Sequence, residues 1–105
     1  MKATASGSII TVEYTEPSTS GGHALDDLDH TTVYMNGVAV KTVPASALTG
    51  GGVVITDIDS GITAGQEGDF TLYATATDTS INKNESTPSP SVTVRVDMLA
   101  PDAPF

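Results

Sequence analysis

The stretch FTLYATATD, residues 70–78, carries the clearest structural pattern in the chain. From Phe70 to Thr77 every second residue is apolar, the residues between are threonines and one tyrosine, and Asp78 ends the run. Because successive side chains of a strand point to opposite faces, this alternation predicts a strand with one buried and one solvent-exposed face. The predicted buried face consists of Phe70, Leu72, Ala74 and Ala76.

Shorter runs with the same period recur along the chain and are separated by turn residues. Asn36-Gly37 tolerates positive φ at both positions and so favours a two-residue hairpin turn. Pro17 ends an early run, since proline cannot donate a hydrogen bond to a strand ladder. No helical periodicity extends over a useful length, so an all-β fold follows. The predicted strands span residues 3–6, 9–15, 31–35, 38–43, 53–58, 70–78 and 92–96.

These strands predict a seven-stranded antiparallel β-sandwich over residues 1–99, followed by a linker-like tail at 100–105. Polar connections are expected at 18–30, 44–52, 61–69 and 79–91. The run Gly50-Gly51-Gly52 has high backbone freedom, so this loop is either mobile or ordered only against a neighbour. The expected core comprises Ile10, Val12, Tyr14, Val33, Met35, Phe70, Leu72, Ala74, Ala76, Val92, Val94 and Val96.

Composition narrows the classes of function. The 105 residues suit one domain, and the absence of cysteine excludes a disulfide framework and a Cys-ligated zinc site. A net charge of −9 argues against nucleic acid and anionic membranes as partners. No apolar run approaches the length of a membrane span. The start at Met1 has no apolar core region, so we expect a protein kept in a cytoplasm until assembly or lysis, or a domain cut from a larger chain.

Several short segments together resemble the fibronectin type III family, in its bacterial and phage form. Tyr14-Thr15-Glu16-Pro17 resembles that family's second-strand Trp-x-x-Pro motif, and residues 70–78 resemble its sixth strand. Asn84-Glu85-Ser86 is similar to a turn common in such domains, and the end of the chain resembles their interdomain linkers. The resemblance implies an immunoglobulin-like sandwich. Tyr14 and Thr31 replace the usual Trp and Tyr, which predicts a core lighter than average.

No constellation for catalysis stands out, so we expect a non-enzyme without a cofactor. His23 and His30 lie seven residues apart, which fits no recognised metal spacing, and are expected to be surface loop residues. No serine lies in a Gly-x-Ser-x-Gly elbow, and no glycine run has the spacing and lysine of a phosphate loop.

Acidic loops are the weak candidates for a metal site. Calcium prefers carboxylate and carbonyl oxygens supplied by flexible loops. The segment from Asp57 to Gly61 lacks a third ligand at the right interval and a closing Glu, and solvated acids are the default at this net charge. We therefore predict no metal site, and the calcium candidates are Asp26, Asp27, Asp29, Asp57 and Asp59.

Tyr34 and Tyr73 occupy outward positions in their predicted strands. Outward tyrosines serve either as interface anchors or as cross-strand partners. Tyr34 and Tyr73 are therefore candidates for an interface.

We expect a non-catalytic structural or adhesive module, either a phage virion component of a tail, fibre or capsid decoration, or an accessory spacer or carbohydrate-binding domain of a secreted bacterial enzyme or adhesin. The expected partners are other structural proteins of the same assembly, a second copy in a homo-oligomer, or surface polysaccharide.

Overall fold

The computed structural model describes residues 1–104, and all regular structure in this range is β-strand. All strand pairings are antiparallel. The strands are β1 (Lys2–Ser6), β2 (Ile9–Thr15), β3 (Thr19–Ser20), β4 (His23–Ala24), β5 (Leu28–Met35), β6 (Val38–Pro44), β7 (Val53–Asp59), β8 (Glu67–Asp78) and β9 (Val92–Asp97).

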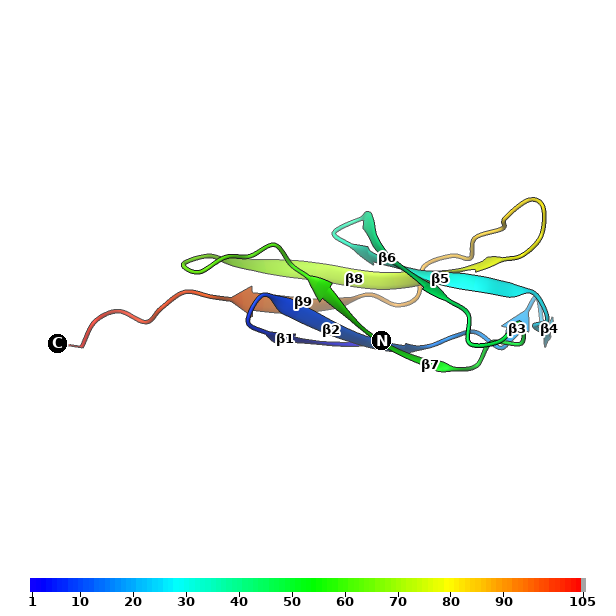
Figure 1. Cartoon of the computed structure of the whole chain (residues 1–105), viewed down its shortest axis with the longest axis horizontal. Coiled ribbons are helices and arrows are strands. Elements are labelled where there is room, and N and C mark those ends of the chain that lie inside the picture. The colour runs from blue at the N-terminus through cyan, green and yellow to red at the C-terminus, as the bar shows by residue number, and fades with distance from the viewer. Residues whose placement is uncertain (105) are drawn as a thin grey trace.

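The strands form two main sheets and a small hairpin. One sheet has the order β1-β2-β7 and the other has the order β6-β5-β8-β9. β3 and β4 pair only with each other, and they lie at the end of the molecule opposite the C-terminal tail (Figure 1). The two main sheets enclose one shared core in a sandwich-like arrangement.

Turn chemistry and alternation position the strands largely as predicted. β2 coincides with the expected run over residues 9–15, and its burial alternates along its length. Asn36 and Gly37 have φ values of 52° and 81°, as a two-residue turn with positive φ at both positions requires. The predicted all-β, antiparallel character of the chain is therefore confirmed.

Two predicted loops contain strand residues that the pattern did not reveal. β8 begins at Glu67, three residues before Phe70, because Glu67, Gly68 and Asp69 pair with the end of β9. Charged residues and glycine show no alternation of apolar and polar side chains, so the sequence pattern did not predict that the strand begins at Glu67. Likewise, the predicted loop at 18–30 includes the hairpin β3–β4 and the start of β5.

The core contains most of the predicted residues and four that were not predicted, of which Leu25 and Leu28 are buried in the segment predicted as a polar loop. Val54 and Ile58 of β7 lie in the buried cluster, although only their strand was predicted. Ala76 is half-buried and lies outside that cluster. Of the other predicted core residues, Ile10, Val12, Tyr14, Val33, Leu72, Ala74 and Val96 are buried, and Met35, Phe70, Val92 and Val94 pack against them.

Tyr14 and Thr31, which stand where the fibronectin type III pattern has Trp and Tyr, contact each other at the edge of this core. The Tyr14 hydroxyl lies 2.6 Å from Thr31 Oγ1, and both side chains are buried. Burial raises the pKa of Tyr14, an effect that the bond to Thr31 opposes and the nearby Glu16 carboxylate reinforces. A buried hydroxyl must be hydrogen-bonded, so each residue satisfies the polar atom of the other.

The loop at 45–52 is held by its own chain, which corrects the expectation that it is mobile or needs a neighbouring molecule. Glu16, 3% exposed, accepts hydrogen bonds from Ser46 N, Ser46 Oγ and Gly52 N at 3.0, 2.5 and 3.0 Å. Burial acts to raise the pKa of Glu16, but these three bonds outweigh it and lower the pKa below its ordinary value. Gly50 has φ +64°, and a Cβ there would lie 2.0 Å from the Pro17 carbonyl oxygen. The glycine therefore permits close backbone packing.

After β9 the chain extends away from the sheets (Figure 1). Met98 still exchanges backbone hydrogen bonds with the connection before β8, through Gly65 and Gln66. Residues 100–104 are exposed, and Phe105, the last residue of the predicted tail, lies outside the described residues.

Candidate functional site

Tyr34 and Tyr73 meet on the outer face of the four-stranded sheet. They are directly paired in the β5–β8 register, and their rings stack with centroids 4.9 Å apart and planes 17° from parallel. Both side chains are half-buried. Of the two roles expected for these tyrosines, the structure shows the cross-strand pair, and the pair forms an aromatic surface that remains a candidate for an interface.

Glu85 joins this surface from a distant part of the sequence. Its Oε2 atom accepts hydrogen bonds from the Tyr34 hydroxyl and from Thr75 Oγ1, each at 2.6 Å. The bonds from Thr75 and Tyr34 lower the pKa of Glu85, and the same carboxylate raises the pKa of Tyr34. The lowered pKa favours the ionised carboxylate, which bonds the hydroxyl of one ring of the stacked pair. We call Tyr34, Tyr73, Thr75 and Glu85 the tyrosine–glutamate face.

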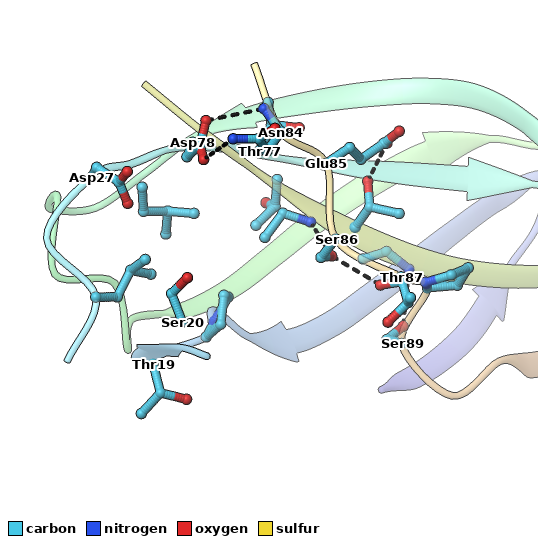
Figure 2. A pocket seen from close by; sticks show the side chains of 18 of the residues that line it. Thr19, Ser20, Asp27, Thr77, Asp78, Asn84, Glu85, Ser86, Thr87 and Ser89 are labelled. Carbon is cyan, nitrogen blue, oxygen red and sulfur yellow. Dashed lines mark hydrogen bonds between the residues drawn. The ribbon is translucent and has the colours of Figure 1, made fainter. Parts of the chain in front are cut away.

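A groove of about 490 Å³ adjoins this face at the end of the molecule that carries the β3–β4 hairpin. Glu85 also lines the groove, so the groove and the tyrosine–glutamate face share a carboxylate. In Figure 2, Thr19 and Ser20 lie on one side of the groove, and Ser86, Thr87 and Ser89 lie on another. The volume is within the range of small-molecule sites. The apolar side chains in the lining include Tyr14, Pro17, Leu25 and Leu28.

The segment that follows β8 forms one wall of the groove. Its serines bond to β8 at positions where β9 no longer pairs with that strand. Ser86 Oγ and Ser89 Oγ accept hydrogen bonds from the backbone N–H groups of Ala76 and Ala74, at 2.9 and 3.0 Å. In return, the N–H groups of Ser86 and Ser89 donate to the carbonyl oxygens of the same two alanines. The C-terminal half of β8 is therefore hydrogen-bonded along the edge that faces β9, although the pairing with β9 ends at Leu72.

Asp78 fixes the start of the same wall. Its carboxylate accepts bonds from Ser80 Oγ at 2.7 Å and from Asn84 N and Nδ2 at 3.0 Å each. The bonds from Ser80 and Asn84 lower the pKa of Asp78. Asp78 therefore holds the first residue of the Asn84-Glu85-Ser86 motif at the end of β8. The motif was noticed in the sequence, but the position of Glu85 against Tyr34 could not be inferred from it.

The two histidines do not share a site. His23 is exposed in β4, whereas His30 is half-buried in β5, not in a loop as predicted. His30 Nδ1 lies 2.6 Å from Asp29 Oδ2, and this bond lowers the pKa of Asp29.

The predicted calcium candidates are divided between the two main sheets. Asp26, Asp27 and Asp29 lie around the start of β5, and Asp27 lines the groove. Asp57 and Asp59 lie on β7, where they accept hydrogen bonds from Thr11 Oγ1 and Gly61 N. Among residues 1–104, no three His, Cys, Asp or Glu side chains are grouped closely enough to hold a metal ion.

The described part of the chain contains no helix long and apolar enough to cross a membrane.

Comparison with known proteins gives a likeness of fold. No protein-family model matches the chain, and no curated protein matches it in sequence. The chain is similar in structure to part of the Clostridium perfringens spore cortex lytic enzyme SleM, with a TM-score of 0.56 and 22% sequence identity. The similarity covers 91% of this chain and 26% of the SleM chain. At this identity the likeness concerns the fold alone.

Proposed function

We propose that this chain is a non-catalytic, fibronectin type III-like module that serves as an accessory domain of a larger bacterial protein. Its work is to space neighbouring domains and to dock them to a glycan-bearing surface through the tyrosine–glutamate face and the adjoining groove. The observation that carries the proposal is the conjunction of a sandwich-like fold with an ordered aromatic and carboxylate surface on one sheet.

Strand placement supports the family assignment. Two antiparallel sheets around one core support this proposal, because an immunoglobulin-like sandwich is built in that way. β6 is bonded to β5 and not to β7, so the chain departs from the division of strands in a constant-type immunoglobulin domain.

The chemistry of the proposed docking surface suits a sugar chain. Aromatic rings pack against the apolar faces of sugar rings, and a carboxylate accepts hydrogen bonds from their hydroxyls. Tyr73 and Tyr34 supply the rings, and Glu85 supplies the carboxylate. Hydroxyl side chains of Ser20, Thr77 and Thr87 line the adjoining groove and add further hydrogen-bonding groups.

Co-sedimentation of the whole chain with purified, insoluble peptidoglycan tests this function, with cellulose as a second polymer. We expect retention on peptidoglycan without release of soluble sugar. The double variant Tyr34→Ala, Tyr73→Ala should reduce retention about tenfold, the equivalent of about 1.4 kcal/mol. Thr4→Ala, on the other sheet, is the control and should leave retention unchanged. Equal retention of the two variants, or steady sugar release by the wild type, would contradict the proposal.

A virion component is the second candidate function. The cysteine-free, strongly acidic composition favours it, since repulsion between like charges keeps a protein soluble at high local copy number. Mass spectrometry of purified phage particles that encode the chain tests this role. Detection in stoichiometric amounts would support it, and absence from the particles would exclude it.

A further inference from the structure

The groove is an open stretch of the seam between the two main sheets. Elsewhere along this seam β1 and β9 contact each other. β1 begins at Lys2, opposite Glu13 of β2, and the pairing of β9 with β8 ends at Leu72. Beyond these two ends, inward-facing side chains such as Tyr14 and Ala74 line the groove. Apolar side chains that edge strands would otherwise cover are therefore open to a ligand there.

The groove and the tyrosine–glutamate face meet at two shared residues. Thr75 and Glu85 belong to the face and also line the groove, whereas Tyr34 and Tyr73 do not line it. Both side-chain bonds that Glu85 accepts within the described chain end on Oε2, so Oε1 is left for a ligand. A ligand that packs on the rings and also enters the groove must pass Glu85. Such a ligand is a chain of several linked units, in which each bound unit favours the binding of the next.

The charge of the groove disfavours one class of glycan. Asp27, Asp78 and Glu85 line it, and none of the described lining residues is Lys, Arg or His. Asp27 and Glu85 lie at separate places along the lining (Figure 2). His30 acts on Glu85 from outside the groove, but its ring is bonded to Asp29. Because like charges repel, a sugar chain that carries carboxylate, sulfate or phosphate groups is disfavoured at this surface.

We propose that the tyrosine–glutamate face and the groove together bind a stretch of several sugar units from a glycan chain without negative charge. This inference rests on the proposed function and names the class of glycan. One sugar ring packs on the stacked tyrosines, and Glu85 accepts hydrogen bonds from the hydroxyls of that unit or the next. The following units lie in the groove, where the hydroxyls of Ser20 and Thr87 offer further hydrogen bonds.

Competition with soluble sugars tests the length of the bound stretch. The whole chain is bound to insoluble peptidoglycan, and N-acetylglucosamine or its linear tetramer is then added. We expect the tetramer to release the chain at a concentration at least about tenfold lower than the single sugar. Thr87 is exposed on the groove wall, so Thr87→Trp should fill part of the groove and remove most of this difference, whereas Thr4→Ala should keep it. Equal potency of the two sugars against wild type, or a full difference in Thr87→Trp, would overturn the proposal.

The same tetramer with its primary hydroxyls oxidised to carboxylates tests the charge. At low salt we expect it to compete at least about tenfold less well than the neutral tetramer. Asp27→Lys should narrow this gap and Asp27→Asn should narrow it less, since Asp27 bonds Thr79 N through a backbone carbonyl that both variants keep. If the neutral tetramer competed no better than the oxidised one, the charge selection would be wrong. A wild type that peptidoglycan does not retain would instead contradict the proposed function itself.

Discussion

Two polar loops that look alike in the sequence are ordered by different means. Residues 45–52 and 79–91 are both rich in Gly, Ser, Thr or Pro, and both were predicted as loops. The first is held by one buried carboxylate, Glu16, which receives three hydrogen bonds. The second is held by a series of half-buried or exposed groups, among them Asp78, Ser86 and Ser89. A single central acceptor makes the first loop sensitive to one substitution, whereas the second should lose its order gradually.

Glu16→Ala should produce the largest effect. It removes three hydrogen bonds to a buried carboxylate, from Ser46, which is exposed, and from Gly52, which is half-buried. Because hydrogen bonds to a charged group contribute more than neutral ones, we expect a loss of about 4 kcal/mol in the free energy of unfolding. Urea denaturation measures this loss. Glu16→Gln keeps an oxygen acceptor and should lose clearly less. If the alanine variant were as stable as wild type, Glu16 would not be what holds the loop.

Gly50→Ala tests the close approach of the same loop to Pro17. A Cβ at this position meets a backbone oxygen and also requires a left-handed alanine, so we expect a loss of about 3 kcal/mol in stability. Gly21→Ala is the matched control, because Gly21 has φ +57° but open space around it. This control should cost about 1 kcal/mol. Equal losses in thermal unfolding would show that only the φ angle matters.

Ser86→Ala and Ser89→Ala test the second loop. Each removes one hydrogen bond to an N–H group of β8, and we expect a loss of about 1 kcal/mol for each. The two bonds are on neighbouring positions of one ladder. The double variant should therefore lose more than the sum if the loop detaches as a unit. Hydrogen exchange at Ala74 and Ala76 reports this detachment directly, and unchanged protection in the double variant would contradict it.

The smallest effect should be a difference between the two loops in how the free energy of unfolding depends on pH. The pKa of Glu16 is lowered in the folded state, so its stabilisation is present above the ordinary value of 4.5 and is lost as the pH falls through the folded-state pKa. Glu85 has the same sign but a more exposed site. Stability measured from pH 7 down to acid should thus decline less steeply in Glu16→Gln, and Glu85→Gln should change this slope least. A steeper decline in either variant would reverse the assigned sign.

Only part of the tyrosine–glutamate face could be predicted from the sequence. Alternation placed Tyr34 and Tyr73 on outer faces, but their direct opposition depends on the register between β5 and β8. Glu85 belongs to a motif that was recognised, yet its bond to Tyr34 spans 51 residues of sequence. Such contacts depend on how a loop returns over a sheet, and no local pattern encodes that path.

The sequence by itself determined most of the strands and most of the side chains that point inward, because alternation and the Asn36-Gly37 turn act within a few residues of chain. Tertiary structure alone decided that Glu16 holds a loop 30 residues away, that Gly50 lies against Pro17, and that Val54 and Ile58 complete the core. The physical reason is that burial and hydrogen bonding depend on what the rest of the chain brings to a site. A carboxylate in a polar segment looks the same in sequence whether water or three protein donors surround it.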